Sequence, residues 1–332
     1  MKKKSLTILN AGIAFLVSFI LSQFTLAIGT SITKSIMSSF GKSSAQIDSF
    51  FATSVGYLLK AIYLNIAFIG VFIWYIKSIN KHDFIQKPNK STLKYALVCI
   101  IFGLLSFFLL SGAINHFQWI VEKLGYKQDS SMFTLNSVKD LIVCYISLAL
   151  IPAVCEELLF RGVIINCLKH KGEIFAVVLS AIMFALFHLS PIQLIYPICW
   201  GLLLGIVYLR TKNILFPIIM HFINNAFSIT IQYFISSSSS GKFEPTIFLA
   251  IYSIITFAVW ILAMVYIFKD FIQHNKTKSQ NIDLKDTNTS TLAAESQSNT
   301  SNSNQETDTY NNLVFYGSIA IMVLIYILLL FA

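Results

Sequence analysis

The sequence predicts an all-α, polytopic transmembrane helical bundle with about eight core spans and one appended C-terminal span. Hydrophobic residues make up 56% of the 332 positions and charged residues only 12%, whereas ordinary globular domains carry roughly 25% charged residues. The apolar residues gather in nine runs, most of them near the roughly 20 residues that a helix needs to cross a bilayer. We therefore expect a multi-pass protein of a cell membrane, with bacterial plasma membrane lipid covering most of its surface.

The runs cover residues 6–28, 54–76, 93–115, 138–168, 174–189, 192–209, 214–235, 245–268 and 313–332. The fifth and sixth runs are short and separated only by Ser190 and Pro191, which predicts a tight helical hairpin or a partly re-entrant pair. The first run follows three lysines and ends near Ala27, so a cleaved signal peptide is one interpretation. The length of its apolar stretch favours an uncleaved helix.

Basic residues give the orientation. With a cytoplasmic N-terminus, 16 of the 24 lysines and arginines fall on the cytoplasmic side and six on the other, with Lys60 and Arg161 inside spans. The positive-inside rule thus predicts nine spans and an external C-terminus. Because the basic residues are scattered between apolar runs, they form no stripe for nucleic acid. Lys60 is solitary, and we expect it to snorkel or to pair structurally.

Composition divides the chain into five parts. Residues 1–137 hold the N-terminal spans, 138–235 a core with unusual polar residues, 236–268 the eighth span, 269–312 a polar linker and 313–332 an anchor span. The linker is rich in Asn, Ser, Thr and Gln, which predicts disorder. The last span is therefore expected to be detached from the core, so that deletion of residues 270–332 would leave the activity of the core intact.

Charged residues inside a membrane span are costly, and each is a functional candidate. Glu156, Glu157 and Arg161 lie in the fourth apolar run. Glu157 and Arg161 are four residues apart and share a helix face, which predicts a structural ion pair. Glu156 points about 100° away from Glu157, has no charged neighbour on its own helix and is left free to react.

Three further polar residues lie on other spans at similar membrane depths. Counted from the charged residue at the cytoplasmic end of each run, Glu156 lies 13 residues deep, His188 15 and His221 nine, or roughly 20, 22 and 13 Å. Asn225 lies four residues after His221, on the same helix face. Any one of the three could be structural, because membrane His and Asn often bond backbone or neighbouring helices. Together at one level, they predict a site.

The five cysteines all lie in apolar runs, without a CxxC pair or metal-ligand spacing. Neither a disulfide framework nor a zinc knuckle is therefore predicted. Cys155 adjoins the two carboxylates, but it has no adjacent base in the sequence, and packing is the favoured interpretation of this thiol.

These residues resemble the CPBP family, also called the Abi or CAAX-protease-like family, which is related to the eukaryotic prenyl-protein endopeptidase Rce1. Its three motifs, EExxxR, FxxxH and HxxxN, stand here in order as Glu156-Glu157-xxx-Arg161, Phe184-xxx-His188 and His221-xxx-Asn225. The resemblance covers roughly residues 138–230 and includes the glycines at 201 and 205, whose small-xxx-small spacing favours close helix packing.

The resemblance implies an intramembrane endopeptidase whose catalytic core is residues 138–235. Glu156 would activate a water as general base, while His188, His221 and Asn225 would position the water and stabilise the oxyanion. By the same resemblance, Glu157, Arg161 and Phe184 would support the site. We expect no cofactor, although Glu156, His188 and His221 could also form a two-His-one-carboxylate zinc site.

Two other function classes remain open from the sequence. One is a binding or immunity protein that protects against a peptide toxin such as a bacteriocin, without proteolysis. The other is a proton-coupled transporter that uses Glu156 and the histidines as a relay. For the enzyme, the expected partner is a membrane-associated peptide or protein, such as a lipidated or amphipathic C-terminus or a pheromone precursor.

Overall fold

The computed structural model describes residues 8–78, 87–88, 90–126, 135, 137–236, 246–287, 312–313 and 315–324, and every regular element within this part of the chain is a helix. The elements are α1 (Ile8–Ser39), α2 (Ser44–Phe51), α3 (Ser54–Ser78), α4 (Lys90–Lys123), α5 (Val138–Cys144), η1 (Tyr145–Leu150), α6 (Ile151–Glu157), η2 (Leu158–Ile165), α7 (Asn166–Leu168), η3 (Lys169–Lys171), α8 (Glu173–Phe187), α9 (Ile195–Thr211), α10 (Leu215–Ser236) and α11 (Ile247–Thr287). A further helical segment covers Phe315–Leu324. The predicted all-α bundle is confirmed.

Six helical stretches are long and apolar enough to cross a membrane, and three shorter apolar helices accompany them. Each of the nine corresponds to one predicted run. The first extends further than predicted, to Ser39, because polar side chains after residue 28 bond within the helix. Thr30 donates to the carbonyl of Leu26 at 2.8 Å, and Thr33 to that of Gly29 at 2.9 Å.

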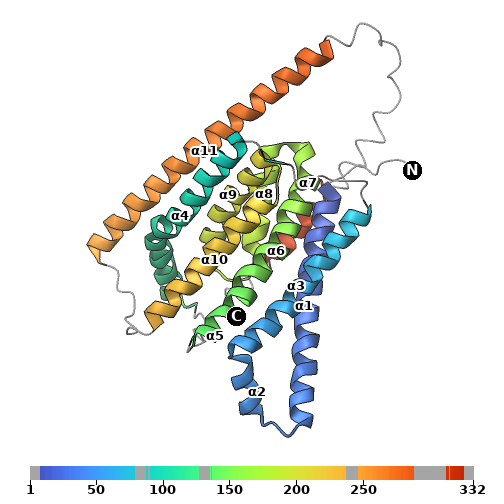
Figure 1. Cartoon of the computed structure of the whole chain (residues 1–332), viewed down its shortest axis with the longest axis vertical. Coiled ribbons are helices and arrows are strands. Elements are labelled where there is room, and N and C mark those ends of the chain that lie inside the picture. The colour runs from blue at the N-terminus through green and yellow to red at the C-terminus, as the bar shows by residue number, and fades with distance from the viewer. Residues whose placement is uncertain are drawn as a thin grey trace.

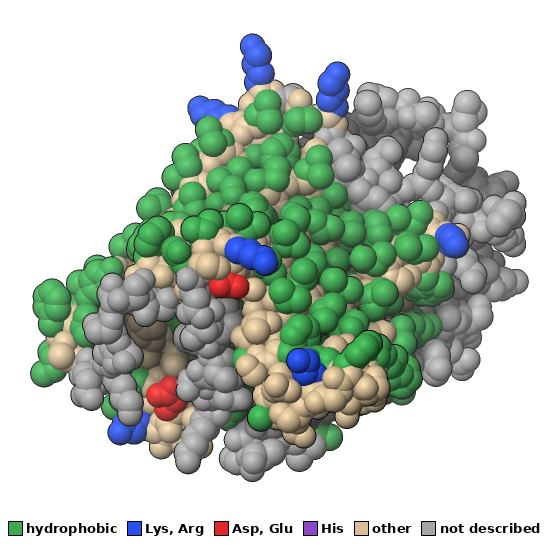
Figure 2. Space-filling model, turned by 60° about the horizontal axis from the view of Figure 1, so that its bottom comes forward, with side chains coloured by type: hydrophobic (Ala, Val, Ile, Leu, Met, Phe, Trp, Pro, Cys, Tyr) green, Lys and Arg blue, Asp and Glu red, His purple; other side chains and the backbone are tan. Residues whose placement is uncertain are grey.

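The outer surface is apolar. Large hydrophobic side chains on α1, α3, α4 and α11 are exposed, such as Ile20 at 61%, Ile66 at 55% and Ile254 at 69%. Figure 2 shows hydrophobic side chains over most of the described surface on one face, with only a few charged side chains among them. Exposed apolar area of this extent is typical of a surface that contacts lipid. The chain is a multi-pass membrane protein.

The helices form three groups across the bundle (Figure 1). Helices α8, α9 and α10 occupy the middle, α4 and α11 pack together on one side, and α1 and α3 pack together on the other, next to α6. The pair α8–α9 packs most closely because Gly201 and Gly205 have no side chains there. A methyl group on Gly201 would lie 3.0 Å from Ala181, and one on Gly205 3.2 Å from Val177. The predicted close approach at these glycines is confirmed.

The helix α8 is too short to cross the apolar layer of a membrane by itself. Its 15 residues extend about 22 Å, against about 30 Å for the hydrocarbon core of a bilayer. The chain turns at Leu189, which adopts a left-handed φ of 48°, and α9 begins at Ile195. The predicted hairpin is confirmed, and its turn directly follows His188, the residue that caps α8.

Lys60 on α3 pairs structurally, as predicted. Its Nζ donates to the carbonyl of Phe51 at 3.1 Å and lies 5.0 Å from the ring centroid of Tyr57. The ammonium group thus closes the C-terminal end of α2, where backbone carbonyls have no helical donor.

The predicted linker begins later than expected. Helix α11 continues to Thr287, so the prediction of disorder from residue 269 is wrong for residues 269–287. This stretch contains no Gly or Pro, and its Lys, Gln and Asp residues tolerate a helix that already has a long apolar start. The rest of the predicted linker, at 288–311, lies outside the described residues.

The last helical segment is not detached from the core. Phe315 and Met322 are both 0% exposed and belong to the apolar cluster that includes Phe15 of α1. Gly12 makes the contact possible, because a methyl group there would lie 3.1 Å from the Cα of Phe315. The predicted detachment of this span is therefore wrong. Small residues on α1 leave space for Phe315 to pack, and a hydropathy profile does not reveal this fit.

The contact between Gly12 and Phe315 gives a test of the C-terminal packing. The substitution Gly12→Leu is expected to destabilise the protein by about 1–3 kcal/mol, because its side chain overlaps Phe315. Thermal unfolding in detergent measures the change. The matched control is Gly70→Leu on α3, where a methyl group meets no atom within 4 Å. Equal unfolding temperatures for the two variants would contradict the described packing.

Candidate active site

The helix that carries the two adjacent glutamates departs from α-helical geometry on both sides of them. Helix α6 lies between two π-helical stretches, η1 and η2, and such stretches are frequent at functional sites. Pro152 has no N–H to donate to the carbonyl of Leu148, four residues earlier. The side chain of Asn225 on α10 donates its Nδ2 to that carbonyl at 3.2 Å. A residue predicted to be catalytic thus also supports the backbone of α6.

Glu157 and Arg161 form the predicted ion pair. Arg161 Nη1 lies 2.7 Å from Glu157 Oε1, and both side chains are 0% exposed. Arg161 Nη2 donates to the carbonyl of Gly201 at 3.1 Å, and the guanidinium lies 5.0 Å from the ring centroid of Phe184. The pair therefore links η2 to both helices of the α8–α9 hairpin.

Glu157 also holds His221. The Nδ1 of His221 lies 2.9 Å from Glu157 Oε1, the same oxygen that accepts from Arg161. An ionised carboxylate accepts and does not donate, so Nδ1 carries the proton and Nε2 is the free nitrogen. Sequence spacing had indicated the Glu157–Arg161 pair but not this third member. Its effect is to fix both the tautomer and the direction of the His221 ring.

The free nitrogen of His221 faces Glu156. His221 Nε2 lies 3.8 Å from Glu156 Oε2, and the Glu156 side chain is 17% exposed. This separation is too long for a direct hydrogen bond but suits a water that contacts both groups. Glu156 is therefore the member of the pair of glutamates that is open to a reactant.

His188 reaches the same place from the end of α8. Its Nδ1 bonds the carbonyl of Phe184 at 2.9 Å, so this nitrogen also carries the proton and leaves Nε2 free. Phe184 contacts both histidine rings edge-on, at 5.0 Å for His188 and 5.8 Å for His221. These contacts, with the one to Arg161, give a physical basis for the predicted supporting role of Phe184.

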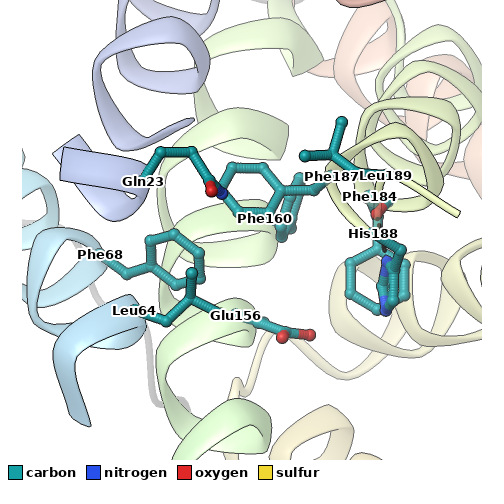
Figure 3. A pocket seen from close by; sticks show the side chains of 9 residues that line it. All are labelled: Gln23, Leu64, Phe68, Glu156, Phe160, Phe184, Phe187, His188 and Leu189. Carbon is teal, nitrogen blue, oxygen red and sulfur yellow. Dashed lines mark hydrogen bonds between the residues drawn. The ribbon is translucent and has the colours of Figure 1, made fainter. Parts of the chain in front are cut away.

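Two cavities meet at Glu156. The larger has a volume of about 570 Å³ and lies among α4, α6, α8, α9 and α10, and the smaller, of about 230 Å³, lies among α1, α3, α6 and α8. Glu156, His188 and Phe184 line both of them, whereas His221 and Asn225 line the larger one. Figure 3 shows the Glu156 carboxylate in the smaller cavity, directed toward the side on which His188 lies.

A hydrogen-bonded chain that the sequence did not indicate runs along the larger cavity. The hydroxyl of Tyr196 donates to Asn224 Oδ1, Asn224 Nδ2 donates to Asn225 Oδ1 at 3.3 Å, and Asn225 donates to Leu148. The only feature of the sequence that pointed to Asn224 was its position next to the HxxxN motif. Tyr196 had none, because a tyrosine in an apolar run looks like any aromatic core residue.

Cys155 takes no part in this arrangement. It is 4% exposed and lines neither cavity, in agreement with the packing interpretation. All five cysteines are free and buried, so the predicted lack of a disulfide framework is confirmed.

The zinc alternative, with Glu156, His188 and His221 as ligands, stays a prediction. Among the residues that the structure describes, no three His, Cys, Asp or Glu side chains converge closely enough to hold a metal ion. The Nδ1 of each histidine bonds an acceptor and leaves Nε2 free, which is also the way in which metal-ligating histidines are usually held. The chemistry below uses the side chains of the chain itself.

The comparison with known families covers this site. Residues 138–227 match the family model described as type II CAAX prenyl endopeptidase Rce1-like. The predicted resemblance to this family is confirmed for this segment. This Rce1-like segment contains every predicted site residue, from Glu156 to Asn225, whereas α1, α3, α4 and α11 lie outside it.

A curated relative agrees with this match. Over 168 residues the chain is 22% identical to "Putative membrane peptidase YdiL" of Bacillus subtilis (strain 168), an alignment that covers 50% of this chain and 68% of that protein. No solved structure matches the chain significantly. At the level of the family, these matches support a membrane peptidase.

The buried pair beneath the site yields a prediction about stability. Glu157→Leu alone is expected to destabilise the protein by about 3–5 kcal/mol, because it leaves the Arg161 charge buried without a partner. The double variant Glu157→Leu/Arg161→Met should recover most of that loss, as the charges disappear together. Thermal unfolding in detergent measures both. A double variant no more stable than the single one would show that the two charges are not coupled.

Proposed function

We propose that this protein is an intramembrane endopeptidase that hydrolyses a membrane-associated peptide or protein, with Glu156 as the general base. One observation carries the proposal. The Glu156 carboxylate lies at the junction of two cavities and 3.8 Å from the free nitrogen of His221, whose ring is held by a fully buried ion pair. A reactive carboxylate beside an oriented imidazole is the arrangement that activates water in general base catalysis.

The reaction begins with a water between Glu156 and the two imidazoles. Glu156 takes one proton from the water, and the resulting hydroxide adds to the carbonyl carbon of the scissile bond. The protonated Glu156 then gives that proton to the amide nitrogen, the C–N bond breaks, and an amine and a carboxylic acid form. The second water proton passes from the acid to the amine, so that an ammonium and a carboxylate leave. All protons are accounted for by the peptide, one water and one carboxylate.

Stabilisation of the oxyanion needs a hydrogen-bond donor. In their neutral forms, His188 and His221 both present an unprotonated Nε2, because Nδ1 of each is bonded to an acceptor. A second proton on either ring would make its Nε2 a donor, and the second N–H of Asn225 is another donor toward the larger cavity. Preorganised donors of this kind are usually the largest single contribution to catalysis.

The role of Glu156 is tested directly by the nearly isosteric Glu156→Gln variant. We expect kcat/KM on a library of membrane peptides to fall at least about 100-fold, as is usual when a general base is removed, with unfolding temperature unchanged. The matched control is Glu122→Gln on α4, an exposed glutamate that bonds only Gln118 among the described residues. His221→Ala should also abolish cleavage.

The same preparation separates the other function classes. Toxin immunity that persists in cells with Glu156→Gln would favour a binding protein. Proton flux in liposomes that this variant abolishes, without any peptide product, would favour a transporter. Loss of cleavage on chelation, restored by one equivalent of zinc, would overturn the water activation proposed here.

A further inference from the structure

The smaller cavity has features that the proposed chemistry does not require. It lies on the opposite side of Glu156 from the polar wall of Tyr196, Asn224 and Asn225, and its lining is mainly aromatic and aliphatic. Two of its walls come from α1 and α3, which lie outside the Rce1-like segment at 138–227. Nothing in the family comparison therefore assigns a role to this cavity.

One polar side chain stands in this apolar lining. Gln23 on α1 extends its amide toward the ring of Phe160 (Figure 3), and it makes no hydrogen bond with any residue that the structure describes. An amide in an apolar membrane environment without a partner costs several kcal/mol. An occupant that bonds the amide would remove this penalty.

We propose that the smaller cavity is a substrate subsite that accepts one bulky apolar side chain next to the scissile bond, with the Gln23 amide bonding the adjacent peptide backbone. The inference rests on the proposed function, because it places the scissile bond at Glu156. The subsite would make the enzyme prefer a residue such as Leu, Met or Phe at one flanking position.

The size of the cavity favours a side chain over a lipid. Its volume of about 230 Å³ is below the range of roughly 300–1,000 Å³ of small-molecule pockets. A hydrocarbon tail would also leave the Gln23 amide without a partner, whereas a peptide backbone brings both an N–H and a carbonyl. The polar wall of the larger cavity then faces the rest of the peptide.

Leu64 on α3 offers the means to change the size of the subsite. It lines the smaller cavity and not the larger one, so its substitution leaves the wall near His221 intact. Leu64→Trp fills the cavity and Leu64→Ala enlarges it. The matched control is Ile66→Trp, two residues along the same helix, where the side chain is 55% exposed and lines neither cavity.

The experiment uses the full chain in liposomes and amphipathic peptides of one scaffold in which each position in turn is randomised. Mass spectrometry of the products gives the cleaved bond and the residues that flank it. For wild type and Ile66→Trp, we expect bulky apolar residues at one flanking position to be favoured over Ala by about tenfold or more in kcat/KM. Leu64→Trp should shift the preference to Ala and Ser, and Leu64→Ala should shift it toward Trp.

Gln23→Leu removes the amide at nearly constant size. It should lower kcat/KM about tenfold for all peptides and leave the flanking preference unchanged, because the backbone bond is common to every substrate. Gln118→Leu on α4, which lines neither cavity, is the matched control.

Failure of this inference and failure of the proposed function give different results. A wild type that cleaves no peptide, or a Glu156→Gln variant that cleaves normally, overturns the proposed function and the subsite with it. Cleavage that Glu156→Gln abolishes, but with the same flanking preference in Leu64→Trp, Leu64→Ala and wild type, overturns only the subsite. Unfolding temperatures confirm that each variant is folded.

Discussion

The arrangement around Glu156 depends on one fully buried ion pair. Glu157 and Arg161 are both inaccessible and 2.7 Å apart in an otherwise apolar bundle, where either charge alone would be strongly unfavourable. Their remaining contacts reach Gly201 of α9, Phe184 of α8 and His221 of α10. Separation of the two charges would therefore also break contacts to three other helices. This constraint keeps the imidazole of His221 directed at Glu156 in a part of the protein that has few other polar contacts.

The backbone near the site contributes a second constraint. A proline inside a transmembrane helix leaves a carbonyl without its usual donor, and a neighbouring helix can supply one. Asn225 does so for Leu148 and is itself held by Asn224. The same amide thus stabilises the helix that carries Glu156 and faces the larger cavity. A substitution of Asn225 would affect both, so a loss of activity there does not by itself distinguish a donor to the oxyanion from a support of α6.

The sequence was sufficient for much of this arrangement. Nine apolar runs predicted the helices, because a helix that crosses a bilayer must be both long and apolar. The i, i+4 spacing predicted the Glu157–Arg161 pair, and depth along each helix brought His221 to the level of Glu156. The cleavage chemistry assigned to these residues remains a proposal.

Other features depend on contacts that no single span encodes. The bond from Glu157 to His221 requires the orientation of two helices, and the hydropathy of the run does not indicate the π-helical stretches on both sides of α6. Gln23 carried a signal that was missed, since an amide inside an apolar run is unusual. The packing of Phe315 against Gly12 was also missed, because hydropathy measures affinity for lipid and not packing against another helix.

The packing of Phe315 against Gly12 has a consequence for biogenesis. Helix α1 is made early and the segment Phe315–Leu324 late, yet the two pack against each other. While the intervening helices are being translated, the groove on α1 at Gly12 has only lipid to fill it. The bundle reaches its final packing only after the late segment has been inserted. A ribosome that stops before this segment would release a protein in which the surface of α1 at Gly12 lacks its packing partner.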